Sequence, residues 1–117
     1  MLIKKIAAIM IHAPDIKAAF TWYRNAFSQS KLVRLEEFNF EFLDVNGIQI
    51  EIVPADEKVA SGAAGSVVYW EVENFQESFD HLTSMGAFLY RGPMKIENNR
   101  QMCQLKDPFG NLIGIRG

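Results

Sequence analysis

The sequence lacks several features that would point to particular classes of protein. Its 117 residues include a single cysteine, Cys103, so no disulfide can form within the chain. No apolar run approaches the length of a membrane-spanning helix. The formal net charge is only −2, with acidic and basic residues interspersed, so we expect no nucleic-acid partner. The N-terminal residues also lack the apolar region of a signal peptide, and we therefore expect a cytoplasmic protein with no membrane contact.

Motifs for covalent and nucleotide chemistry are missing as well. The sequence has no Ser-His-Asp set, no phosphate-binding glycine loop and no CxxC pair. Only two histidines are present: His12 ends an expected strand, and His81 falls on the polar face of an expected helix. Nucleophilic catalysis and nucleotide binding therefore have no support from motifs.

What the sequence does contain is organised around the stretch from Asp107 to Gly114. Asp107-Pro108 favours a turn, because proline fixes φ and aspartate can accept a hydrogen bond from the backbone two residues on. Gly110-Asn111 tolerates positive φ, and a strand pattern follows. A weaker copy of this stretch, with Asn46-Gly47 as its hairpin signal, lies at residues 44–51.

The expected elements run twice through the order βαβββ. In the first half the spacing predicts a strand at 6–13, a helix to about Phe27 capped by Asp15, and strands at 32–35, 37–44 and 48–53. In the second half it predicts a strand at 66–72, a helix capped by Asn74, and strands at 88–91, 100–106 and 112–115. Phe20 and Phe79 lie 59 positions apart, and Gly47 and Gly110 lie 63 apart. We interpret the chain as one α+β domain of two tandem modules, 1–53 and 66–117, joined by a linker at 54–65.

With these elements in place, the chain resembles the vicinal oxygen chelate superfamily, which includes glyoxalase I, bleomycin-resistance proteins and extradiol dioxygenases. The resemblance rests on the strand–Asp15–helix unit ending Phe20-Thr21-Trp22-Tyr23-Arg24-Asn25-Ala26-Phe27, its repeat at 70–82, Gly92-Pro93, and Asp107-Pro-Phe-Gly-Asn-Leu-Ile. It covers essentially the whole chain. It implies that the two modules form a curved, mostly antiparallel sheet around a cleft, with the helices on the convex side and a second chain usually completing the cleft.

The resemblance also implies four positions for metal ligands, and most of them carry no donor here. In metal-dependent members these positions lie seven residues before each helix cap and once in each hairpin-return strand. In this sequence they fall on Ala8, Glu51, Val67 and Gly114, of which only Glu51 could bind a metal. We therefore expect no metal and no cofactor, and neither metal-dependent glyoxalase nor dioxygenase activity.

Alternation along the expected strands sorts the side chains into two faces, independently of the resemblance. One face is apolar and should lie under the helices; it includes Ile50 and Ile52, and also Phe40 and Phe42 if the turns at Asp44 and Asp107 are equivalent. The other face should line the cleft, and from it we take as candidate ligand-binding residues Met10, His12, Glu41, Gln49, Glu51, Tyr69, Glu71, Met102 and Gln104. No lysine or arginine is among them, so Glu41, Glu51 and Glu71 favour a cationic guest. The same glutamates could also simply be solvated.

Three hypotheses about function follow. The first is a metal-free protein that binds a small organic molecule, of cationic character, for resistance or sequestration. The second is a glyoxalase-like lyase or isomerase in which Glu51 is the candidate catalytic residue, acting as general base. The third is a non-catalytic interaction module. In each case we expect a homodimer, because pairing across chains would complete the cleft and cover exposed strand edges.

Overall fold

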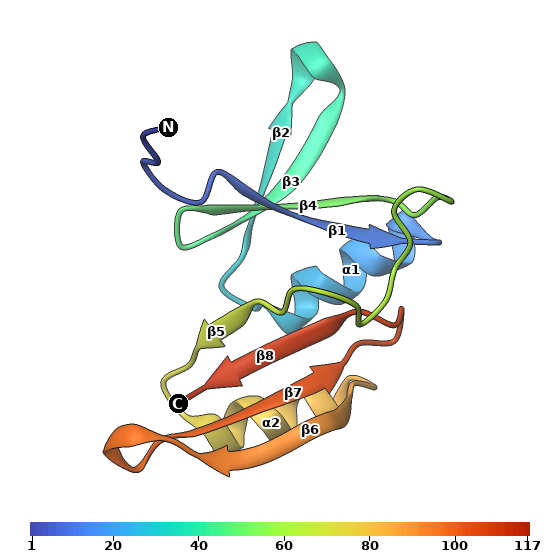
Figure 1. Cartoon of the computed structure of the whole chain (residues 1–117). Coiled ribbons are helices and arrows are strands. Elements are labelled where there is room, and N and C mark those ends of the chain that lie inside the picture. Colours follow the sequence, from blue (N-terminus) through green and yellow to red (C-terminus); the bar gives the residue numbers. More distant parts are fainter. The chain divides into compact units, whose positions relative to one another are not determined.

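The computed structural model describes residues 1–117 and confirms the α+β fold class, with two α-helices and eight strands in two mixed sheets (Figure 1). The chain divides into two compact units, Met1–Ala60 and Ser61–Gly117, which we call the N-terminal and C-terminal units. Each unit holds one βαβββ module. Neither helix is long enough, nor apolar enough, to cross a membrane.

The N-terminal unit is a four-stranded sheet with one helix. Its elements are β1 (Ala8–Ala13), α1 (Ile16–Ala26), β2 (Lys31–Leu35), β3 (Phe40–Val45) and β4 (Ile48–Pro54). The strand order is β1-β4-β3-β2, in which β1 and β4 are parallel and the other pairs are antiparallel. Helix α1 can therefore act as the crossover that a parallel β1–β4 pair requires.

Helix α1 begins where the sequence predicts, because the Asp15 carboxylate accepts a hydrogen bond from the Ala18 N–H at 3.1 Å. Its apolar stripe contributes Ala19 and Tyr23 to the core, and both are buried, as are Leu43 and Ile50 of the sheet. The ring of Tyr23 meets that of Phe27 edge to face at a centroid distance of 5.5 Å. This packing sets which face of the sheet is buried.

The C-terminal unit repeats the arrangement. Its elements are β5 (Tyr69–Glu71), α2 (Phe75–Ser84), β6 (Phe88–Lys95), β7 (Gln101–Lys106) and β8 (Leu112–Arg116), in the order β5-β8-β7-β6. The Asn74 side chain caps α2 by accepting from the Glu77 N–H at 3.0 Å, as predicted. The buried core lies on one face of the sheet and comprises Phe75, Leu82, Ala87, Cys103, Leu105, Ile113 and Ile115.

Three strands differ from the sequence prediction by three or more residues at one end. The strand expected over 37–44 starts only at Phe40, because Glu36–Phe38 forms a 3-10 turn and Asn39 is left-handed with φ 48°. The strand expected over 88–91 continues to Lys95 past Gly92-Pro93, because irregular pairing accommodates the proline on an edge strand. The strand expected over 66–72 is regular only at Tyr69–Glu71.

The register of the first hairpin shows that the expected side assignment of β3 is wrong. Leu43 pairs with Ile50, and both are fully buried, so Leu43 faces α1 and Phe42 does not. The reason is loop length: only residues 46 and 47 separate the paired Val45 and Ile48. In the second hairpin residues 107 to 111 separate the paired Lys106 and Leu112. The turns at Asp44 and Asp107 are therefore not equivalent, and the alternation along β3 shifts by one.

Candidate functional site

The face of each sheet opposite its helix, which we call the helix-free face, holds most of the sequence-predicted site residues. In the C-terminal unit, strand register places Gln104 beside Gly114 and Gly114 beside Tyr69. The Gln104 amide N–H donates to the Tyr69 hydroxyl at 2.9 Å. The Tyr69 ring lies against Gly114 so closely that a Cβ added there would be 2.6 Å from the ring carbon Cδ1. These three residues form one fixed aromatic and amide platform.

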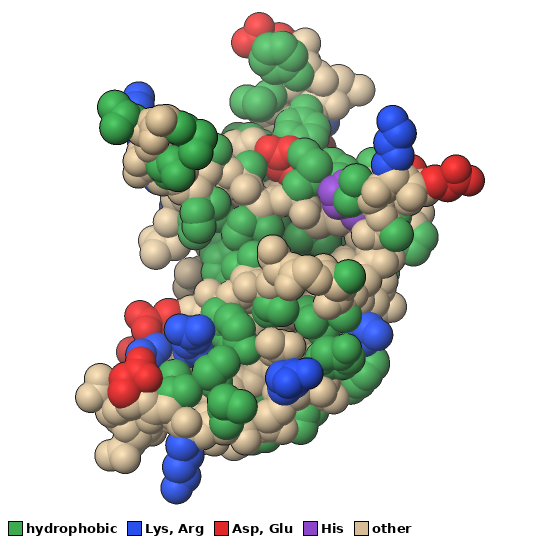
Figure 2. Space-filling model, viewed as in Figure 1, with side chains coloured by type: hydrophobic (Ala, Val, Ile, Leu, Met, Phe, Trp, Pro, Cys, Tyr) green, Lys and Arg blue, Asp and Glu red, His purple; other side chains and the backbone are tan.

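Basic side chains share this face, which corrects the expectation that it carries no lysine or arginine. The guanidinium carbon of Arg116 lies 4.6 Å from the centroid of the Tyr69 ring, a cation–π contact. Arg116 pairs with Met102 across β7 and β8, and Lys106 pairs with Leu112. In Figure 2, viewed as in Figure 1, the surface of the C-terminal unit shows Lys and Arg side chains lying among hydrophobic ones.

Glu71, a further predicted site residue, is already engaged within the chain. Its carboxylate accepts a hydrogen bond from the Arg100 guanidinium and forms an ion pair with it. Arg100 also lies 3.7 Å from a carboxylate oxygen of Glu97. Glu71 therefore already has a cationic partner before any ligand arrives.

In the N-terminal unit the helix-free face centres on Glu51. The Gln49 amide N–H donates to one carboxylate oxygen of Glu51 at 2.7 Å, and both side chains are half-buried. Met10 is the neighbour of Glu51 on β1, and His12 lies two residues further along the same face. The shifted register adds Phe42, whose ring lies 6.3 Å from that of Phe40. Sequence reasoning had assigned this aromatic pair to the core.

Glu41 lies on the opposite side of the sheet from Glu51, contrary to the expectation that both line one face. It shares the alternation of the buried Leu43 and pairs with Arg34 on β2. A nitrogen of the Arg34 guanidinium donates to its carboxylate at 2.9 Å. The one-residue shift of β3 is the physical reason for this change of face.

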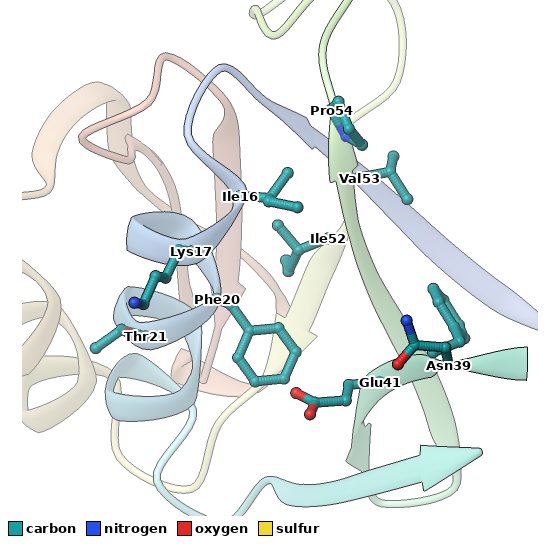
Figure 3. A pocket seen from close by; sticks show the side chains of 10 residues that line it. Ile16, Lys17, Phe20, Thr21, Asn39, Glu41, Ile52, Val53 and Pro54 are labelled. Atoms are coloured by element: carbon teal, nitrogen blue, oxygen red, sulfur yellow. The ribbon is translucent and has the colours of Figure 1, made fainter. Parts of the chain in front are cut away.

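Glu41 borders a pocket of about 430 Å³ between α1 and the strands β3 and β4. Figure 3 shows Ile16 and Phe20 of α1 directed toward Ile52 of β4, with the Glu41 carboxylate below the Phe20 ring. The walls are mostly apolar, and the one carboxylate is already paired with Arg34. This pocket lies on the helix side of the sheet, away from Gln49 and Glu51, and no sequence signal pointed to it.

The residues present do not fit the divalent metal that the resemblance implies in other members. Of the four ligand positions, Ala8, Val67 and Gly114 have no donor, and the space beside the Gly114 backbone is filled by the Tyr69 ring. Neither unit gathers three or more His, Cys, Asp or Glu side chains into a group that could hold a metal ion. A metal-binding side chain at position 114 would require the ring to move.

The sequence motif at Asp107 proves to be structural. Its carboxylate accepts from the Phe109 N–H at 2.8 Å and from the Asn111 N–H at 2.9 Å, and the residue is 1% exposed. The Asn111 side chain in turn accepts from the Gly62 N–H at 2.9 Å. The stretch fixes the loop before β8, and so places Leu112, Gly114 and Arg116 on the helix-free face.

Comparison with known proteins identifies the family. No curated protein sequence matches the chain. Among solved structures, a member of the glyoxalase/bleomycin resistance protein/dioxygenase superfamily from Sphaerobacter thermophilus DSM 20745 is 16% identical, with a TM-score of 0.75 and coverage of 99% of this chain and 98% of that one. A glyoxalase-related enzyme from Fulvimarina pelagi is 18% identical, with a TM-score of 0.74 and coverage of 97% of this chain and 88% of that one.

TioX from Micromonospora sp. ML1 is 16% identical, with a TM-score of 0.66 and coverage of 97% of this chain and 98% of that one. Structural similarity at such low sequence identity establishes the fold alone. The family model described as "Glyoxalase/Bleomycin resistance protein/Dioxygenase superfamily" matches residues 5–115. The chain therefore belongs to the glyoxalase/bleomycin resistance protein/dioxygenase superfamily.

Proposed function

We propose that the chain is a metal-free member of its superfamily that binds a small organic molecule on the helix-free face, in the manner of a resistance or sequestration protein. The observation that carries the proposal is the Tyr69 ring lying against Gly114, with its hydroxyl held by Gln104. At the position where the family resemblance implies a metal-binding side chain, this chain has an oriented aromatic ring.

The surrounding side chains suit a small-molecule site. Binding sites of this kind combine apolar and aromatic area with a few oriented polar groups. In the C-terminal unit Tyr69, Met102 and Leu112 provide contact area, while Gln104 and the Tyr69 hydroxyl provide hydrogen-bonding groups. In the N-terminal unit the Gln49–Glu51 pair lies on the same face as Met10. Both helix-free faces therefore meet the chemical requirement.

We also propose that the protein is a homodimer. Both sheets end in edge strands with exposed apolar side chains, Leu32 and Leu35 on β2 and Phe88, Leu89 and Tyr90 on β6. Unpaired edges of this kind commonly pair with another chain or are covered by one. A cytoplasmic location stays a prediction.

A thermal-shift screen of metabolites and antibiotics tests the proposed function, because a ligand that binds only the folded state raises the melting temperature. We expect hits that persist in excess chelator. The Tyr69→Ala variant should lose these shifts, whereas Phe38→Ala, which removes a 71% exposed ring from the 3-10 turn before β3, should retain them. Stabilisation that requires an added divalent metal would contradict the proposal, and a complete absence of hits would favour an interaction module.

A second candidate function rests on Glu51. Gln49 orients its carboxylate through one oxygen, and no hydrogen bond within the chain engages the other oxygen. A half-buried carboxylate with one free oxygen could act as a general base on a carbon acid. Turnover of an α-hydroxycarbonyl substrate by the wild type, lost in Glu51→Gln and retained in Glu41→Gln, would establish this function. Equal loss in both variants would argue against a catalytic role for Glu51.

A further inference from the structure

We infer that the helix-free face of the C-terminal unit selects a small organic anion with a flat apolar part. The inference rests on the proposed function, because it names the class of ligand that the same face takes. It reverses the expectation of a cationic guest, which was drawn from Glu41, Glu51 and Glu71.

The first step is the charge on the face. Strand register places three basic residues on it, Arg91 opposite Gln104, Lys106 opposite Leu112 and Arg116 opposite Met102. None of these three side chains forms an ion pair with a carboxylate of the chain. The single carboxylate on this face, that of Glu71, is paired with Arg100. Positive charge therefore predominates on this face, and these three cations have no carboxylate partner within the chain.

The second step is the position of Arg116. Its guanidinium carbon lies 4.6 Å from the Tyr69 ring centroid, so the ring attracts and orients the cation without using its N–H donors. Those donors remain free to bind a carboxylate, and planar guanidinium groups bind carboxylates through two parallel hydrogen bonds. Lys106 is held in a comparable way, with its ammonium nitrogen 5.4 Å from the centroid of the Tyr90 ring.

The third step is the apolar area beside these cations. Tyr69, Met102 and Leu112 are half-buried on the same face, and the Tyr69 hydroxyl accepts from Gln104 while keeping its own proton to donate. A flat apolar group resting on these side chains would bring an attached carboxylate to Arg116. An ammonium group in the same place would meet three like charges and no free carboxylate.

Three probes of one shape test the inference: 2-naphthoate, 2-naphthylmethanol and 2-naphthylmethylamine, each titrated into the protein with amide chemical shifts as the readout. We expect the anion to bind at least about tenfold more tightly than the alcohol, given the strength of charge-assisted hydrogen bonds. The shift changes should centre on β7 and β8. Arg116→Gln should remove this preference for the anion, and the control Arg24→Gln, which removes one exposed cation from the end of α1, should retain it.

The outcomes separate the inference from the function on which it rests. Equal or tighter binding of the alcohol or the amine at these strands would overturn the preference for an anion and leave the proposed function standing. The absence of shift changes with all three probes would count against both. Anion binding that is unaffected by Arg116→Gln, in a variant that melts as the wild type does, would overturn the role of Arg116.

Discussion

The ring of Tyr69 lies against the backbone of Gly114, its neighbour on the adjacent parallel strand. A Cβ at position 114 would lie 2.6 to 2.8 Å from three carbons of the ring, closer than real Cβ contacts allow. The two residues are thus mutually dependent: the aromatic platform requires a glycine beneath it, and the glycine removes a ligand position that the family resemblance implies.

The first prediction concerns the stability of this pair. Gly114→Ala should lower the free energy of unfolding by about 1–3 kcal/mol, because overpacking forces the Tyr69 ring from a position that Gln104 also holds. In Tyr69→Val the space is open, so adding Gly114→Ala should cost less than in the wild type, with a coupling of about 0.5–3 kcal/mol. Urea unfolding of the wild type, the two single variants and the double variant measures this coupling energy. Additive effects would show that the ring and the glycine do not restrict each other.

The second prediction concerns metal. Protein purified without chelator should contain far less than one equivalent of zinc, nickel or iron by elemental analysis, because one carboxylate from Glu51 cannot form a stable site alone. Adding these ions should leave the melting temperature unchanged, in the wild type and in Glu51→Gln alike. A near-stoichiometric metal lost in Glu51→Gln would show that other donors complete a site.

Much of the fold follows from local sequence signals. The Asp15 and Asn74 caps, the apolar stripes of both helices and the turn at Asp107 lie within short stretches, and each acts through contacts to residues nearby in the chain. The doubling of the βαβββ order could be found for the same reason. The helix-side burial of Ile50, Ile52, Ile113 and Ile115 is correctly predicted by alternation.

The candidate site was less accessible to sequence reasoning. The side of the sheet on which each β3 residue lies depends on how many residues the hairpin loop contains, and Asn39 interrupts the strand pattern just before β3. Alternation alone therefore assigns Glu41 and Phe42 to the wrong faces of the sheet. Arg116 and Lys106 follow the alternation of Gly114 and Gln104 and could have been found from it. Arg91 could not, because the irregular pairing of β6 breaks the alternation.

The third prediction compares two aspartates in corresponding hairpins. Asp107→Ala should lower the free energy of unfolding by about 2–3 kcal/mol, since it would leave two backbone N–H groups of a partly buried loop without their acceptor. Asp44→Ala should cost only about 0.5–1 kcal/mol, because the Asp44 carboxylate accepts a single hydrogen bond, from Gly47 in an exposed turn. Chemical denaturation of both variants gives the comparison, and equal losses would refute the structural role assigned to Asp107.

The fourth prediction concerns Cys103, whose burial raises the pKa of its thiol to about 11. The native protein should react with iodoacetamide at pH 8 far more slowly than the unfolded protein, because the thiolate is the reactive form. Since the folded pKa lies above the ordinary value of 9.0, the contribution to stability is complete below pH 9 and is lost as pH rises toward 11.

Two measurements check the prediction for Cys103. The alkylation rate should follow the unfolded fraction when urea is added, and Cys103→Ala should show a smaller loss of stability between pH 9 and pH 11 than the wild type. Rapid alkylation of the native protein at pH 8 would mean that the thiol is accessible to solvent.

The last prediction concerns the edge strands. We expect the protein to sediment at micromolar concentration as a dimer, with twice the chain mass of 13.3 kDa. Strand β6 is the better candidate for the contact, because all eight of its residues are exposed and it is longer than the five-residue β2. Leu89→Lys, on β6, should therefore shift the equilibrium toward monomer, since an exposed lysine on an edge strand opposes pairing. Leu32→Lys, on β2, provides a matched control, as the two leucines are 41% and 42% exposed. A wild-type monomer at this concentration would refute the dimer, and dissociation by Leu32→Lys alone would place the contact on β2.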